Sequence, residues 1–150
     1  MDNNFKIPYE LGFTTHFEKT VSESDVYMFA GISGDMNRVH LNDQYMKGTA
    51  IGERVAHGML TFSIASAAET KLLDAKFQEM EDAGISYLSA GYEHVRFIKP
   101  VFFGDTLNVS YELTDINEET KKTIGRLTVV NQNGVVVMVA DHILKFFPKQ

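Results

Sequence analysis

The sequence predicts an α+β fold in which a curved antiparallel sheet wraps around one long buried helix. Residues 57–73 carry apolar side chains on nearly every side of the expected helix, a pattern typical of a helix buried in the protein. From residue 86 onward, alternating or continuously apolar segments are separated by turn residues, as in consecutive antiparallel strands. A sheet that curls round a single helix satisfies both patterns.

The chain is expected to begin with a strand followed by a capped helix. Residues 12–17 contain β-branched and aromatic side chains and are interpreted as the strand. Ser22, with Asp25 three positions later, resembles a capping box and predicts a helix start. The helix is expected to end at Gly34, where a loop begins.

Shorter elements are expected between this loop and the long helix. Asp43 is predicted to cap a short helix over 44–47 that ends at Gly48. Residues 49–56 are predicted to be irregular. After the long helix, residues 77–84 are interpreted as a connection without secondary structure.

The second half of the chain is interpreted as four consecutive strands. Turn signals separate them at Lys99-Pro100 and Gly104-Asp105, at 117–120 and at Asn133-Gly134. The expected strands are 86–98, 106–113, 123–131 and 135–147. The apolar run at the start of the last strand predicts burial on both faces of the sheet.

Residues 33–40 carry the side chains that are most suggestive of chemistry. Asp35 and His40 are five positions apart, so on a helix they would lie roughly 140° apart and face different ways. They converge only if the stretch is a turn or loop, which Gly34 and Asn37 permit because both tolerate a left-handed backbone. A carboxylate and an imidazole directed at one point can hold a water and exchange protons with it. A simple turn with a histidine as hydrogen-bond partner fits the same residues.

Composition limits the classes of function. The chain has 150 residues, 44% of them hydrophobic, and residues 1–150 are expected to form a single domain. A net charge of −6 argues against nucleic-acid and anionic-membrane partners. The sequence has no cysteine, which excludes disulfides, thiol nucleophiles and cysteine-ligated metals.

The sequence also predicts where the protein works. Residues 1–4 are polar and no apolar segment follows, so no signal peptide is expected. The apolar-rich stretch 59–68 is too short to span a bilayer. The five histidines lack a spacing typical of metal sites. We therefore expect a cytoplasmic protein with no metal and no cofactor.

Three segments resemble the MaoC-like family of (R)-specific enoyl-CoA hydratases. Residues 29–40 resemble the family's hydratase motif, and its core, Gly-Asp-x-Asn-Pro-x-His, matches Gly-Asp-Met-Asn-Arg-Val-His at residues 34–40. Residues 57–60, His-Gly-Met-Leu, resemble the entry to its central helix, and residues 100–107 resemble a recurring segment of its sheet. The three matches occur in the family's order. The resemblance implies the hot-dog fold, usually as a homodimer or a higher homo-oligomer.

The same resemblance implies an activity in fatty acid metabolism. The reaction would be reversible hydration of trans-2-enoyl-CoA, an acyl-CoA thioester, to (3R)-3-hydroxyacyl-CoA. Asp35 and His40 match the catalytic pair, which would hold the attacking water between them. Gly58 matches the residue that gives its backbone N–H to the thioester oxygen, and N–H groups in the first turn of a helix are free for this role. The alternative for Gly58 is a glycine needed only for packing.

Four other residues are assigned to the surroundings of this pair. Asn37 is expected to shape the loop, and His57 to cap the helix or orient the loop. Ser66 falls where the family often has a serine near the catalytic aspartate, which would allow a hydrogen bond to Asp35, but a small packing residue in the buried helix is the preferred interpretation. Arg38 replaces the family's proline, and we expect it to face solvent rather than a substrate phosphate.

Three other functions fit parts of this pattern. A 3-hydroxyacyl-acyl-carrier-protein dehydratase would use the same residues with a different thioester handle. A hot-dog thioesterase is disfavoured because Asp35 and His40 match the hydratase motif. A non-catalytic acyl-CoA-binding module would not require either of these two residues, and both are present.

Overall fold

The computed structural model describes residues 5–149. The first four residues, which carry the prediction about a signal peptide, lie outside this range. The elements follow in the order β1 (Thr14–Thr20), α1 (Glu23–Ser33), α2 (Arg38–Leu41), α3 (Asp43–Lys47), α4 (Gly58–Ala75), α5 (Phe77–Asp82), β2 (Ile85–Phe97), β3 (Thr106–Asn117), β4 (Lys122–Val130) and β5 (Val136–Pro148).

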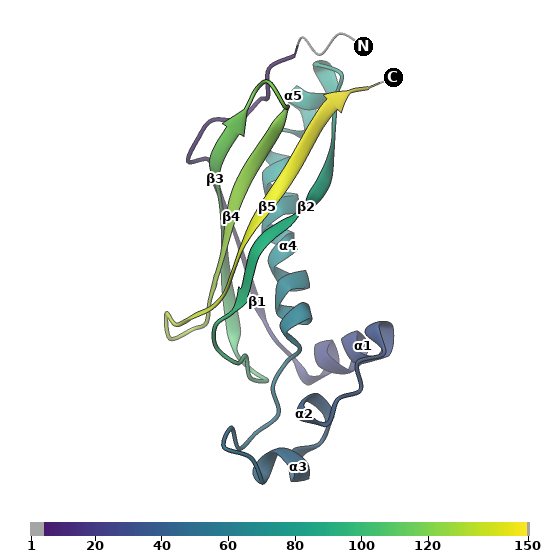
Figure 1. Cartoon of the computed structure of the whole chain (residues 1–150), viewed down its shortest axis with the longest axis vertical. Helices are drawn as coiled ribbons and strands as arrows, with labels where there is room; N and C mark the ends of the chain where they lie inside the picture. Colours follow the sequence, from purple (N-terminus) through teal and green to yellow (C-terminus); the bar gives the residue numbers. More distant parts are fainter. Residues whose placement is uncertain (1–4, 150) are drawn as a thin grey trace.

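The strands form one curved antiparallel sheet in the order β1-β3-β4-β5-β2. The long helix α4 runs along the sheet, with α1, α2 and α3 gathered at one end and α5 at the other (Figure 1). This is the predicted α+β hot-dog arrangement, and the fold class is confirmed. Strands β1 and β2 are the two edges of the sheet.

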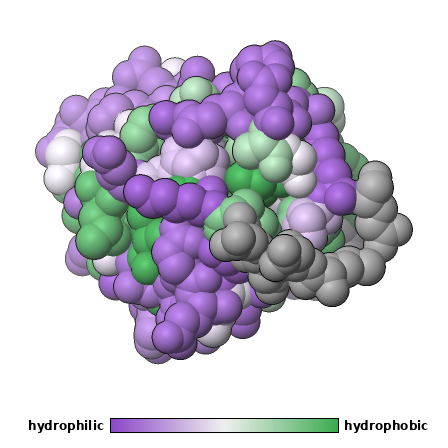
Figure 2. Space-filling view, turned by 90° about the horizontal axis from the view of Figure 1, so that it is seen from above, coloured by the Kyte–Doolittle hydropathy of each residue, from purple (hydrophilic) through white to green (hydrophobic). Residues whose placement is uncertain are grey.

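The end of the molecule that carries α5 shows mostly hydrophilic residues, with smaller hydrophobic patches between them (Figure 2). Among the described residues, no helix is long and apolar enough to cross a membrane.

The local signals for α1 were correct. The Ser22 hydroxyl accepts from the Asp25 N–H while the Asp25 carboxylate accepts from the Ser22 N–H, so both halves of the capping box form. Gly34 ends the helix with a left-handed φ of 77°, a conformation that glycine adopts without strain.

Two predictions about short helices were wrong. Asn42, not Asp43, caps α3, because its side-chain oxygen accepts from the Tyr45 N–H at 2.8 Å. The connection predicted over 77–84 contains α5, whose Met80 is buried in the core. Burial of the Met80 side chain in the core stabilises a helix that the local sequence does not predict.

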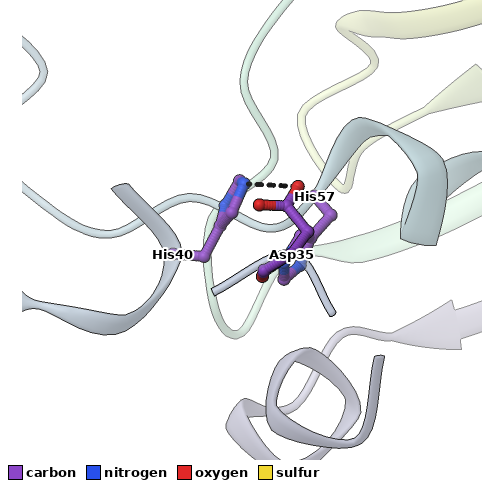
Figure 3. Close-up of side chains that lie close together, drawn as sticks. All are labelled: Asp35, His40 and His57. Carbon is purple, nitrogen blue, oxygen red and sulfur yellow. Dashed lines mark hydrogen bonds and ion pairs between the residues drawn. The ribbon is translucent and has the colours of Figure 1, made fainter. Parts of the chain in front are cut away.

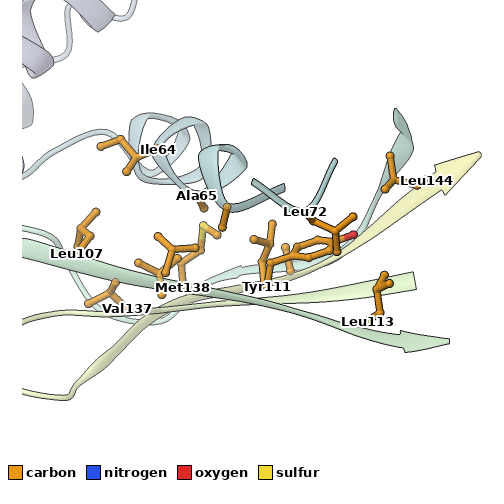
Figure 4. Packing of buried hydrophobic residues seen from close by; sticks show 14 of the residues in the cluster. Ile64, Ala65, Leu72, Leu107, Tyr111, Leu113, Val137, Met138 and Leu144 are labelled. Atoms are coloured by element: carbon orange, nitrogen blue, oxygen red, sulfur yellow. The ribbon is translucent and has the colours of Figure 1, made fainter. Parts of the chain in front are cut away.

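The helix α4 packs one face against the sheet rather than being covered on all sides. The residues on that face are Leu60, Thr61, Ile64, Ala65, Ala68, Glu69 and Leu72. They meet buried side chains of β3 and β5, among them Leu107, Tyr111, Leu113, Val137, Met138 and Leu144 (Figure 4). Met59 and Ser63, on another side of α4, are exposed in the single chain. The prediction that α4 is buried on nearly every side was therefore wrong for the single chain.

A polar cluster interrupts this core between α4 and the sheet. The Tyr92 hydroxyl donates to Glu69 Oε2 at 2.8 Å, and Glu69 Oε1 has no partner among the described residues. The ring of His142 lies between the Tyr111 hydroxyl (3.2 Å) and the Ser89 hydroxyl (2.9 Å). Burial raises the pKa of Glu69 to about 7 and lowers the pKa of His142 to about 4. Both groups are therefore uncharged near pH 6.

These two shifts give opposite pH dependences of stability. The pKa of Glu69 is raised in the folded state. Its contribution to the free energy of unfolding is therefore complete below pH 4.5 and is lost as the pH rises through about 7. His142 has a lowered folded pKa, so its contribution is complete above pH 6.5 and is lost as the pH falls through about 4. Between pH 4.5 and 6.5 the loss of stability from Glu69 and the gain of stability from His142 with rising pH nearly cancel.

We predict that Glu69→Gln changes this balance. Wild-type protein should lose stability from pH 6.5 to 8, whereas Glu69→Gln should gain stability from pH 4.5 to 6.5 and then remain level. The Glu69 contribution amounts to about 2–3 kcal/mol. Urea unfolding at pH 5, 6.5 and 8 measures it, with Glu119→Gln, a change of the same residue type at an exposed position, as control. A wild-type profile that Glu69→Gln leaves unchanged would contradict a protonated Glu69.

Candidate active site

The loop after α1 places Asp35 at the surface of a pocket. The left-handed Gly34 turns the chain, and the Ser33 hydroxyl accepts from the Asp35 N–H at 3.2 Å. Asp35 Oδ1 accepts from the Asn37 N–H at 3.3 Å. Oδ2 is left free, and the side chain is 52% exposed. The loop therefore holds the carboxylate without occupying both of its oxygens.

His40 is on the short helix α2 rather than in the loop that the sequence predicted. Asn37 begins this helix, and its side chain accepts from the Val39 N–H at 3.2 Å. With a φ of −61°, Asn37 does not adopt the left-handed backbone that it tolerates. Gly34 alone provides that turn, and the helix start then directs His40 back toward Asp35.

A backbone carbonyl sets the tautomer of His40. The Nδ1 atom is 2.7 Å from the carbonyl oxygen of Val55, which can only accept, so Nδ1 carries the proton. In the neutral ring Nε2 then has a free lone pair. This Nε2 points at Asp35 Oδ2 across 3.9 Å (Figure 3). The gap is too long for a direct hydrogen bond, and it suits a water that donates one proton to each side.

His57 supports both members of this pair. It stands at the N-cap of α4 but makes no side-chain cap bond. Its Nε2 donates to the Asp35 carbonyl at 2.9 Å, which ties the loop to the start of α4. Its ring stacks on His40 with centroids 3.7 Å apart and an interplanar angle of 29°. Its geometry thus orients the loop rather than capping the helix.

Gly58 is the first residue of α4 and opens onto a pocket of about 450 Å³. The pocket is lined by Phe29, Ser33, Asp35, His57, Gly58, Met59 and Phe97. None of the described residues accepts a hydrogen bond from the Gly58 N–H. A second pocket of about 340 Å³ shares Gly58 and Phe97 with the first and continues past Lys99. Gly58 therefore offers a free N–H where two hollows meet.

The structure brings four of the predicted site residues together at the start of α4. Asp35, His57 and Gly58 line the pocket, and His40 lies beside it, close to Asp35 and His57. Asn37 acts on the site only through the backbone it caps.

Ser66 does not make the hydrogen bond to Asp35 that was considered from the sequence. Its hydroxyl donates to the Ser63 carbonyl at 2.7 Å, within α4. Arg38 is exposed at the first position of α2, with its guanidinium 5.9 Å from the Tyr45 ring centre.

Sequence reasoning missed the walls of the pocket and the supports of His40. Phe29 and Phe97 line the pocket from α1 and the end of β2. Phe29 lies in the segment that resembles the hydratase motif, but no role at the site was predicted for it or for Phe97. Val55 acts through its carbonyl, which every residue type possesses, so no signal in the sequence could identify it.

The three polar side chains of the site are also residue types that can bind a metal ion. Asp35, His40 and His57 offer ligand atoms within 4.8 Å of one another, although their spacing in the sequence is not that of a metal motif. Imidazole lone pairs lie in the ring plane, and the two stacked rings do not direct theirs at one point. The donor set therefore fits a shared water better than an ion.

Comparison with known proteins extends these observations. Residues 8–135 match the profile of the MaoC like domain. The (R)-specific enoyl-CoA hydratase of Rhodospirillum rubrum is 33% identical over 84% of this chain and 81% of its own length. The 3-hydroxybutyryl-CoA dehydratase of Methylorubrum extorquens is 31% identical over 94% of this chain and 82% of its own. Unliganded R-hydratase PhaJ1 from Pseudomonas aeruginosa superposes with a TM-score of 0.73 at 30% identity, over 95% of this chain and 84% of its own.

Proposed function

The chain belongs to the MaoC-like family of hydratases and dehydratases, and from that premise we propose that it is an (R)-specific enoyl-CoA hydratase. The reaction is the reversible hydration of a trans-2-enoyl-CoA to (3R)-3-hydroxyacyl-CoA. The observation that carries the proposal is the 3.9 Å gap between Asp35 Oδ2 and His40 Nε2, two acceptors that face one another beside the pocket. We further propose that the chain is a single MaoC-like domain.

The pair accounts for both protons of the water. A water in the gap donates one hydrogen bond to Asp35 Oδ2 and one to His40 Nε2, which leaves an oxygen lone pair for attack on Cβ of the enoyl group. As the C–O bond forms, one of the two acceptors takes a proton from the water. That proton then goes to Cα, so a water molecule is added and the enzyme returns to its starting state.

The start of α4 accounts for the charge that develops on the substrate. As the water attacks, negative charge builds on the thioester oxygen. The free Gly58 N–H at the positive end of an 18-residue helix can stabilise this charge. Phe29, Met59 and Phe97 give the pocket apolar walls against which the acyl chain can lie.

Hydration of crotonyl-CoA, followed as loss of enoyl absorbance with chiral analysis of the product, tests the proposal. Formation of (3R)-hydroxybutyryl-CoA supports it. Release of free CoA thiol would indicate a thioesterase instead. Binding without turnover of CoA or carrier-protein thioesters of any chain length would indicate a binding module and would overturn the proposal.

We predict that Asp35→Asn and His40→Gln each fold normally but lower kcat by roughly 10²–10⁴-fold, because each removes one of the two proton acceptors. Initial rates with crotonyl-CoA and the midpoint of thermal unfolding measure the two effects. His16→Gln and Asp82→Asn, which change the same residue types at exposed positions outside the pocket, should retain wild-type rates. Near-normal turnover in either site variant would remove that residue from the catalytic pair.

Gly58→Ala separates a role in catalysis from a role in packing. The added Cβ would lie 3.0–3.1 Å from the ring of Phe97, which is half-exposed and can move. We expect kcat/KM to fall about tenfold or more, because the ring and the methyl group crowd the approach to the N–H. Thermal stability should hold or rise, since alanine favours helices over glycine by up to about 1 kcal/mol.

The matched control is Gly31→Ala in α1, where a Cβ meets no atom within 4 Å. This variant should keep its rate. If Gly58→Ala loses stability and keeps kcat/KM, Gly58 is a packing residue only.

We propose that the protein is a homodimer or a higher homo-oligomer. The 13-residue strand β2 leaves one edge of the sheet without a partner, and Leu88 on that strand is 65% exposed. Exposed Met59 and half-exposed Phe97 near the pocket would also gain cover from a second copy. Light scattering after size exclusion should give at least twice the 16.9 kDa chain mass, and a monomer at working concentration would refute this.

A further inference from the structure

Arg54 lies in the segment between α3 and α4, and all three nitrogens of its guanidinium donate to neighbouring side chains. Its Nε donates to Asp43 of α3 at 2.6 Å, and its Nη2 donates to Glu23 of α1 at 2.6 Å. Its Nη1 donates to the Tyr27 hydroxyl at 2.8 Å, and the guanidinium carbon is 4.6 Å from the ring centre of Phe103. Only 11% of the side chain is exposed.

The partners of Arg54 also bind one another. The Tyr27 hydroxyl donates to Glu23 at 2.6 Å while it accepts from Arg54. Hydrogen bonds from Tyr27 and Arg54 lower the pKa of Glu23. The guanidinium thus joins two helices and the 100–105 loop at a single point, which a solitary surface ion pair does not do.

The next residue in the chain is the one that orients His40. Val55 donates its N–H to the Val39 carbonyl at 3.1 Å and accepts from His40 Nδ1 at 2.7 Å. It also forms a β-bridge with Phe102. The Val55 carbonyl is therefore held by these backbone contacts together with the adjoining Arg54, which attaches the segment to α1 and α3.

We propose that Arg54 is a positioning residue that fixes the tautomer of His40 through the Val55 carbonyl. With Val55 held in place, His40 keeps its proton on Nδ1 and presents the free lone pair of Nε2 to Asp35. If the carbonyl moves away, the proton can pass to Nε2, and the pair loses one of its two acceptors. The consequence for catalysis rests on the proposed function, whereas the effect on the tautomer does not.

The geometry requires arginine in particular. The guanidinium donates in three directions within one plane while its face lies over Phe103. A lysine ammonium at this position is a single point charge and cannot reach all three oxygen partners with the same geometry. Arg54→Lys should therefore retain the charge but only part of the positioning.

Nitrogen-15 NMR of the histidine rings at pH 8 reads the tautomer directly, with His40 assigned from the signal lost in His40→Gln. Wild-type protein should show His40 protonated at Nδ1, and Arg54→Met should show a mixture with the Nε2-protonated form. We expect kcat for crotonyl-CoA to fall about 10–100-fold in Arg54→Met while KM changes less than threefold, with Arg54→Lys intermediate. Arg126→Met and Arg126→Lys are matched controls, because Arg126 pairs with Asp141 at 2.7 Å on β4 and β5, away from the pocket.

The proposal is overturned if Arg54→Met retains the Nδ1 tautomer of His40, whether or not kcat falls, because a loss of rate would then reflect stability alone. If Arg54→Met does not fold, Glu23→Gln and Asp43→Asn each remove one charged partner of Arg54. The nitrogen-15 spectrum of His40 in these two variants then tests the proposal. A wild-type protein that hydrates no thioester would overturn the proposed function, and the NMR result would still decide whether Arg54 controls His40.

Discussion

The packing of one face of α4 against the curved sheet determines where the site can be. It fixes the direction of the helix axis, and with it the free N–H groups at Gly58. The segments before the helix attach to this fixed point, since His57 at the N-cap holds the Asp35 carbonyl and lies against the His40 ring. A shift of the helix would therefore move the oxyanion donor and the proton acceptors together.

Main-chain carbonyls set the chemistry of both histidines at the site. His40 donates to Val55 and His57 donates to Asp35, so each ring is held by an oxygen that can only accept. Such a partner is present whatever side chain its own residue carries, and this gives the ring nitrogens defined roles without a second charged group. The buried Glu69 and His142 differ from this arrangement, because desolvation rather than a carbonyl partner keeps them uncharged.

The sequence predicted best where a single local interaction decides the structure. The capping box at Ser22 and the glycine turn at Gly34 depend on nearby atoms alone, and the strand periods report one buried face. It failed where distant residues decide, as for α5, which depends on the burial of Met80, and for the loop residue Asn37, which caps α2 instead. The pairing of Asp35 with His40 followed from the motif, but the carbonyl of Val55 and the pocket wall at Phe97 come from segments far along the chain.

The sheet order has a consequence for how the molecule is assembled. Thr20 of β1 and Thr106 of β3 are neighbours across the sheet but lie 86 positions apart in the chain. Contacts of such large sequence separation carry a high loop-closure cost and slow folding. During synthesis, β1, α1 and the residues that converge on the pocket all leave the ribosome before β3 exists. The pocket can therefore become ordered only after the last strands have been made, and until then the apolar faces of β1 and α4 lack the strands that cover them.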